Sequence, residues 1–448
     1  MNAINDISPS VAQAPPLDRK GNARRAAVAS YLGTTVEFYD FFIYGTAAAL
    51  IFPTVFFQDV PPALGVILSY VTLAAGYAAR PLGGILFGHF GDRIGRKKML
   101  VLSMMIMGVV SIAIGILPAT ATIGVLAPVL LVLLRIIQGI AVGGEWAGAS
   151  LMALEHAQPK NRGFAASIVS SGAPSGAVCA TLVFAALSSL PKEQLLSWGW
   201  RVAFLASVLL VIIAVILRTK VTESPEFLRD VAEGKNKTKV APLLSVLRNS
   251  PGRLTSGTLA GIAPFFLQSL LATFVITYAV TQGHVQSTVL WMVTIANALM
   301  IFTVPAFAAL SDRIGRKPVM LAGYVGGILA IWAVFGLVSD GSTPLLLLAF
   351  IIANPIVNGL MYGPMGAFLS EKFSTETRYT GMALSYQIAT LLGAGFAPLI
   401  ASSLLIAGGG ETWMISLCFV GMCLIGAFAV LLGKEHNKSS ETQRATTR

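Results

Sequence analysis

The stretch of sequence that decides the fold is GDRIGRK at residues 91–97, which returns as SDRIGRK at residues 311–317. The two copies lie 220 residues apart in a chain of 448, and each is a short cationic turn between long apolar segments. A near-identical match at almost half the chain length predicts two related halves. Because both copies are flanked in the same way, we expect them on the same side of a membrane, which makes the repeat parallel rather than inverted.

The composition indicates an all-α membrane protein. The chain is 55% hydrophobic and 11% charged, with mean hydropathy +0.76, whereas a soluble domain carries about 25% charged residues. Its apolar runs reach the roughly 20 residues that cross about 30 Å of hydrocarbon as a helix. No ten-residue alternation of the kind found in membrane β-barrels is present.

The basic residues predict a topology rather than a nucleic-acid partner. The net charge is +11, but the Lys and Arg residues fall in short loops between apolar runs. The positive-inside rule accounts for that placement, and it puts both termini in the cytoplasm with an even number of spans. The cysteines fall inside apolar runs and we expect neither disulfides nor metal ligands from them, nor any cofactor: Cys179, Cys418 and Cys423.

Twelve membrane-spanning helices are expected, arranged as two six-helix bundles. The fourth and tenth runs are longer than a bilayer needs, so their cytoplasmic ends should project beyond it. The expected spans are 26–50, 64–90, 98–117, 122–154, 163–188, 200–218, 254–280, 287–310, 318–338, 343–370, 379–404 and 412–433.

The domain organisation follows from these spans. A second repeat supports it, because Glu155 and Arg162 have the same spacing as Glu371 and Arg378, 216 residues later. Two motifs at nearly one offset predict bundles related by an axis along the membrane normal. We expect a disordered cytoplasmic tail at 1–25, a first bundle at 26–218, a cytoplasmic linker at 219–252, a second bundle at 253–433 and a cytoplasmic tail at 434–448.

Several motifs resemble those of one transporter family. GHFGDRIGRKK at 88–98 is similar to the loop signature of the major facilitator superfamily, and RIIQG at 135–139 with GGE at 143–145 is similar to its fourth-helix motif. The likeness to the metabolite:proton symporter branch covers about 28–432. It rests on VEFYDF at 36–41, RPLGG at 80–84, WGWR at 198–201, and GPM at 363–365 with Gly381 and Tyr386.

The resemblance implies proton-driven uptake of a small organic acid or osmolyte across the bacterial inner membrane. Members of this branch take citrate, 2-oxoglutarate, shikimate, dicarboxylates, aromatic acids, or proline and betaine, and family membership does not choose among them. We expect an organic acid, H⁺ and the lipid bilayer as partners of a monomer. Osmolyte uptake, efflux by antiport and metabolite sensing without transport stay open as alternatives. No nucleophile and base can be placed together, so no enzyme is expected.

Charged side chains inside the spans are the sharpest functional signal. A charge within a span costs several kcal/mol, yet Glu37, Asp40, Arg80, Arg135 and Glu145 all fall inside spans of the first half. The second half has no charged residue well inside an expected span. We expect Asp40 as the main proton site and Glu37 as the second. Arg135 should pair with the substrate carboxylate or with the protonatable acid, because guanidinium offers two parallel hydrogen bonds. The alternative is a permanent ion-pair network.

The second half offers neutral polar side chains that could hydrogen-bond a substrate, although each could instead bond a neighbouring helix. Together with the first-half groups, the expected substrate-binding residues are Arg135, Arg80, Tyr44, Gln138, Glu145, Gln268, Asn297, Asn354, Asn358, Tyr362, Tyr386 and Gln387.

The loop signatures predict a gate. Acidic and basic residues at the ends of the second, fourth, eighth and tenth spans can pair when the cytoplasmic side is closed and separate when it opens. Alternatively, the basic members only set the topology. The expected gating residues are Asp92, Arg93, Arg96, Glu155, Arg162, Asp312, Arg313, Arg316, Glu371 and Arg378.

Overall fold

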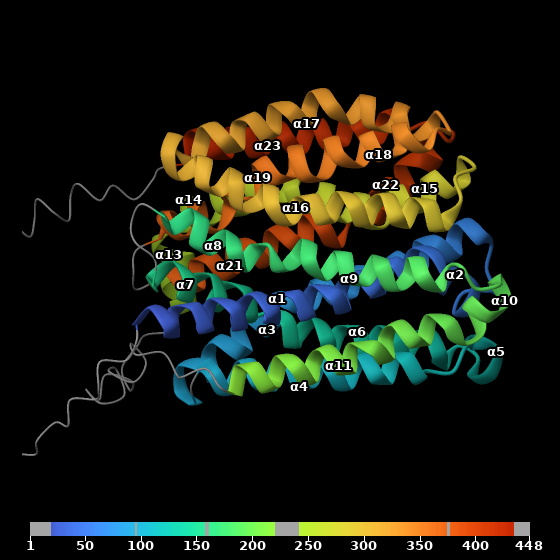
Figure 1. Ribbon diagram of the computed structural model, residues 1–448, viewed down its shortest axis with the longest axis horizontal. Coiled ribbons are helices and arrows are strands. Elements are labelled where there is room, and N and C mark those ends of the chain that lie inside the picture. Colours follow the sequence, from blue (N-terminus) through green and yellow to red (C-terminus); the bar gives the residue numbers. More distant parts are fainter. Residues whose placement is uncertain (1–18, 95, 157–160, 220–241, 374–376, 434–448) are drawn as a thin grey trace, which may run out of the picture.

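The computed structural model describes residues 19–94, 96–156, 161–219, 242–373 and 377–433. Over these residues it is built from helices that run side by side along the long axis of the molecule, without strands (Figure 1). Ten helices are long and apolar enough to cross a membrane, and a shorter apolar helix covers Val101–Ile116. With α1 (Arg19–Leu50) they make twelve. The expected fold class, twelve helices in two bundles, is confirmed.

The first half contains six long helical segments with short helices between them. Long segments that contain a break carry two or more labels. The elements are α1, α2 (Phe52–Val55), α3 (Pro62–Ile94), α4 (Arg96–Ile116), α5 (Thr120–Ile123), α6 (Leu126–Val142), α7 (Glu145–His156), α8 (Arg162–Ser170), α9 (Gly172–Leu187), α10 (Lys192–Gln194), η2 (Leu195–Gly199) and α11 (Trp200–Thr219).

The second half repeats this plan after α13 (Pro242–Asn249), which lies within the expected linker. Its tenth and eleventh spans each contain a wide π-helical turn, labelled η. The elements are α14 (Pro251–Ala272), α15 (Phe274–Thr281), α16 (Gln286–Ile314), α17 (Arg316–Ser339), α18 (Thr343–Ile351), η4 (Ile352–Asn358), α19 (Gly359–Tyr362), α20 (Met365–Lys372), α21 (Arg378–Thr390), η5 (Leu391–Gly395), α22 (Ala397–Ala407) and α23 (Trp413–Leu432).

The chain begins and ends its helical part at the same end of the molecule. We call this the termini end; it lies on the left in Figure 1, and α2, α5 and α10 lie at the opposite end. The outward faces carry large apolar side chains, such as Phe302, Leu329 and Phe428, that stay exposed. An apolar surface of this extent suits a lipid environment. Several charged side chains, such as those of Asp40, Arg80 and Arg135, are instead buried in the interior.

Glycines bring α3 and α6 into backbone contact. A Cβ at Gly83 would overlap the carbonyl of Ile140, and one at Gly139 would overlap the carbonyl of Gly76. Small residues allow such close helix crossings inside membranes. The contact sets the two arginine-bearing helices against each other.

This packing yields a prediction. Gly83→Ala should destabilise the protein by about 1–3 kcal/mol or more, because the added methyl meets backbone that cannot move aside. The control is Gly421→Ala in α23, where a Cβ meets nothing and the helix gains up to about 1 kcal/mol. Thermal unfolding of the detergent-purified variants measures both, and equal midpoints would contradict the packing assignment.

Candidate functional site

Five charged side chains lie in the interior of the first half. Glu37 and Asp40 come from α1, Arg80 from α3, Arg135 from α6 and Glu145 from the start of α7, and each is between 1% and 3% exposed. These are the residues that the sequence placed inside the spans. Their burial shows that none of them faces lipid.

One aromatic ring lies between the two arginines. The Arg80 guanidinium carbon is 4.1 Å from the Phe41 ring centroid and the Arg135 guanidinium carbon is 4.2 Å from it. Arg80 also lies over Tyr77 at 4.7 Å, and Arg135 over Tyr44 at 4.1 Å. Aromatic faces attract cations, by about 2 kcal/mol or more where water is excluded. These rings therefore offset part of the cost of burying two like charges.

A chain of hydrogen bonds joins Asp40 to Arg135. Ser111 of α4 donates to Asp40 Oδ2 at 2.8 Å, Gln138 Nε2 donates to Ser111 Oγ at 3.2 Å, and Arg135 Nη1 donates to Gln138 Oε1 at 2.6 Å. The acid and the guanidinium are thus linked through two neutral side chains rather than directly. Sequence reasoning missed Ser111, which is one of two serines in an otherwise very apolar helix.

Both guanidiniums keep an open edge. The Nε and Nη2 atoms of Arg80 and of Arg135 are fully buried and have no hydrogen-bond partner in the protein, and neither has Asp40 Oδ1. The N–H groups on Nε and Nη2 lie side by side and match the two oxygens of a carboxylate. A buried charged donor left unpaired is costly. The arrangement therefore suits an anion.

The second half supplies neutral groups, as expected. Asn297, Asn354, Asn358 and Tyr362 are buried, whereas Gln268 is half-buried. Asn354 Nδ2 donates to Asn297 Oδ1 at 3.0 Å, and Asn297 Nδ2 donates to the carbonyl of Val293. Asn297 and Asn354 are thus held by each other, while the polar atoms of Asn358 and Tyr362 have no partner in the protein.

Tyr386 and Gln387 lie at a contact between the halves. The fourth span breaks at Gly143 and Gly144. Gln387 Nε2 donates to the Gly143 carbonyl at 2.7 Å, and Tyr379 Oη donates to the Gly144 carbonyl at 2.9 Å. The Tyr386 ring stacks on Trp146 with centroids 3.8 Å apart. Helix α21 therefore docks onto carbonyls that the helix break leaves available.

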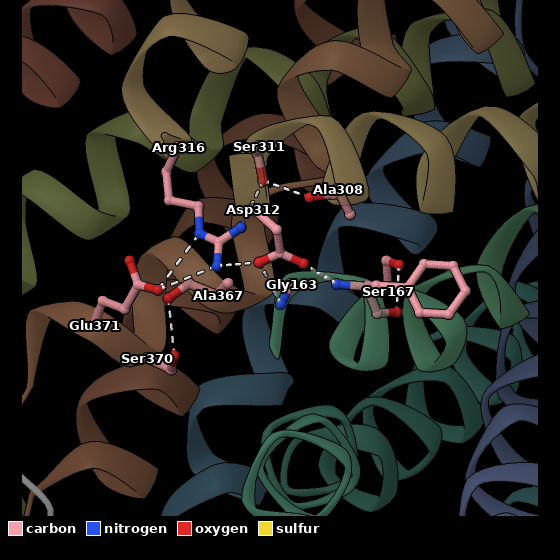
Figure 2. Close-up of polar contacts among 10 residues, drawn as sticks. Gly163, Ser167, Ala308, Ser311, Asp312, Arg316, Ala367, Ser370 and Glu371 are labelled. Atoms are coloured by element: carbon pink, nitrogen blue, oxygen red, sulfur yellow. Dashed lines mark hydrogen bonds and ion pairs between the residues drawn. The ribbon is translucent and has the colours of Figure 1, made fainter. Parts of the chain in front are cut away.

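A second contact between the halves lies at the termini end and joins a carboxylate to backbone N–H groups (Figure 2). Asp312 of α16 accepts hydrogen bonds from the backbone N–H groups of Gly163 and Phe164, at 3.0 and 2.9 Å, in the first turn of α8. Helix N-termini favour negative charge. Arg316 Nη2 lies 2.5 Å from Asp312 and 3.3 Å from Glu371, so it ties α16 to α20. We call these residues the Asp312 cluster.

The remaining expected gating residues fall into two groups. Arg162 and Arg378 are half-buried and Arg313 is exposed. The side chains of Asp92, Arg93, Arg96 and Glu155 lie outside the described part of the chain. The structure therefore brings together Asp312, Arg316 and Glu371 in the second half.

The opposite end is joined by neutral groups. The hydroxyls of Tyr70 and Thr277 lie 3.2 Å apart, and Thr294 donates to Thr181 at 2.7 Å. Each pair joins the first half to the second. The halves thus touch at both ends, with charged contacts at the termini end and hydroxyl contacts at the other.

Two helical bundles around buried charges define a membrane transporter. The chain belongs to the Major Facilitator Superfamily, whose model matches residues 30–384 and 283–448. It is 39% identical to the inner membrane metabolite transport protein YhjE of Escherichia coli, over 93% of this chain and 95% of that one. It is 36% identical to the E. coli shikimate transporter, over 93% of this chain and 96% of that one. The xylose transporter XylE shares the fold, with 18% sequence identity and a TM-score of 0.73 over 93% of this chain and 97% of that one.

These findings establish the class of activity. The chain is a membrane transporter of metabolites and not an enzyme. A further relative, the glycine betaine/proline/ectoine/pipecolic acid transporter OusA of Dickeya dadantii, is 31% identical over 93% of this chain and 84% of its own. The relatives' names therefore span both acids and osmolytes.

The Asp312 cluster yields a prediction. If it holds the termini end closed, Asp312→Ala should expose that end, because the α8 N–H groups and Arg316 lose a shared anion. In a protein without native cysteines, Ala166→Cys in α8 reports on the termini end and Ala49→Cys in α1, beside Thr277, on the opposite end. Maleimide should label the first reporter at least about fivefold faster, the factor given by about 1 kcal/mol, and the second no faster.

A control variant and two contrary outcomes complete the test. Asp340→Ala removes an exposed carboxylate after α17 and should leave both labelling rates unchanged. Equal acceleration at both reporters would indicate general loosening, and no acceleration would mean that the cluster does not close this end.

Proposed function

We propose that this transporter is a symporter that imports a small organic acid together with protons. The observation that carries the proposal is the pair of buried guanidiniums, Arg80 and Arg135, each with an open Nε and Nη2 edge, beside the buried acids Glu37 and Asp40. One set of groups suits a carboxylate and the other can hold a proton. The name of the shikimate transporter, 36% identical, agrees with an acid as cargo.

Charge balance explains why the two ligands would travel together. The five buried charged side chains of the first half are two guanidiniums and three carboxylic acids. Protonation of Asp40 therefore removes one negative charge from the neighbourhood of Arg135. Binding of an anion then becomes more favourable. By linkage, the anion strengthens proton binding to the same extent. The hydrogen bonds through Ser111 and Gln138 give this coupling a direct route.

The two seals suggest how access alternates. Rocking of one bundle against the other would break the Asp312 cluster and the α21 contacts, which opens the termini end while the hydroxyl contacts keep the opposite end closed. Rocking back would restore the contacts at the termini end and break the hydroxyl contacts at the opposite end. We place the termini in the cytoplasm of a bacterial cell, because the basic loops lie at that end. The inward proton gradient then drives accumulation, and a monomer suffices.

Osmolyte uptake is the second candidate, favoured by the proline and betaine transporters among the relatives. A zwitterion would present its carboxylate to the arginines and its cationic group to Glu37, which lies within electrostatic range of Tyr362 and Tyr386. Uptake into proteoliposomes, with and without an inward proton gradient, separates the candidates when organic acids and betaines are compared.

The coupling role of Asp40 yields a prediction. Asp40→Asn should abolish accumulation driven by a proton gradient, because an amide cannot exchange a proton, while exchange of internal for external substrate continues. Uptake and counterflow in the same proteoliposomes measure the two activities. Asp59→Asn, at an exposed position, is the matched control and should accumulate normally. Gradient-driven accumulation by Asp40→Asn would remove Asp40 from the coupling role.

A further inference from the structure

One buried amide in the second half differs from all the others that the structure describes. The buried amide side chains are Gln138, Asn297, Asn354, Asn358 and Gln387. Four of them hydrogen-bond to protein atoms. Asn358 is 1% exposed, yet neither Nδ2 nor Oδ1 has a partner in the protein. A buried amide without hydrogen bonds costs the folded protein about 1–3 kcal/mol of stability, unless another molecule binds it.

A second open group lies one turn further along the chain. Tyr362 is 2% exposed, and its hydroxyl makes no well-aligned hydrogen bond within the protein, although the polar groups of Tyr386, Ser170 and Trp146 lie near it. Its ring packs edge-on against Phe265, and its hydroxyl lies close to Ser170 and Trp146 of the first half. Tyr362 therefore belongs to the face of the second half that meets the first, and Asn358 lies one turn before it in the same span.

The internal repeat explains why this position is polar. The offset of 220 residues relates Gln138 to Asn358 and Gly139 to Gly359. The same offset relates Arg135 to Pro355, so the second half keeps the amide and loses the cation. Pro355 lies in the π-helical turn η4, which ends at Asn358. Such wide turns are frequent at functional sites.

From these observations we infer that Asn358 and Tyr362 form a subsite for hydroxyl groups of the cargo, so that the transported acid is a hydroxy acid. The inference rests on the proposed function, in which Arg80 and Arg135 receive the carboxylate. An amide offers a donor and an acceptor side by side, and a hydroxyl is both donor and acceptor. A second carboxylate fits less well, because Asn358 Oδ1 would repel it.

Ligand binding by the detergent-purified full chain tests the subsite without transport. The probes are pairs that differ only in hydroxyl groups: shikimate with cyclohex-1-enecarboxylate, malate with succinate, and citrate with tricarballylate. Wild type should bind the hydroxylated member at least about tenfold more tightly in one pair or more. Asn358→Leu, which keeps the volume and loses both polar atoms, should remove that preference, since each lost hydrogen bond leaves a buried group unpaired.

Two further variants keep the test sharp. Tyr362→Phe removes a single hydroxyl and should reduce the same preference with little risk to folding. Asn354→Leu breaks the bond to Asn297 and serves as a structural control, which should weaken both members of a pair equally.

The outcomes separate the two proposals. A hydroxyl preference that disappears in Asn358→Leu supports the subsite, even if a proton gradient fails to drive uptake and the symport proposal falls. Equal binding of both members by wild type, equal loss of both in Asn358→Leu, or no binding of any acid overturns the subsite. Gradient-driven uptake without hydroxyl preference overturns the subsite alone.

Discussion

Two guanidiniums that share one aromatic ring are the constraint on which the interior depends. Arg80 and Arg135 repel each other, and both are removed from water. Burial of an isolated charge costs many kcal/mol, so the first half must surround the pair with compensating groups. The rings of Phe41, Tyr44 and Tyr77 do this in part. The acids of α1 and α7 lie buried in the same half and add negative charge.

The cost of the guanidinium N–H groups that stay unpaired is what would make the site respond to an anion. A cluster that was fully satisfied by protein groups would gain little from a ligand, whereas open Nε and Nη2 edges gain a great deal from an anion. The glycines of α3 and α6 hold these edges in place, because backbone contact leaves the two helices little room to shift. Rigid packing beneath unpaired donors is the physical basis of the carboxylate site that we propose.

Much of the fold could be predicted from the sequence. The repeat at residues 91–97 and 311–317 indicates two related halves, and hydropathy and loop charge determine the number of spans. The buried charges were also visible, since a charge in an apolar run must turn inward. Helix periodicity could not show which partners meet. Ser111 joins Asp40 to Arg135 only through the packing of α4. Gln387 stays a predicted cargo contact, and the bond that it makes to Gly143 depends on a helix break that no local pattern located.

The two halves share one frame and have diverged in charge. Gly139 and Gly143 pack against α3, and their repeat counterparts Gly359 and Gly363 pack against α16. Arg135 stands in one copy where Pro355 stands in the other. In the function that we propose, this division of charge lets a proton and an anion balance each other in the first half, and it leaves the second half free to discriminate by neutral hydrogen bonds.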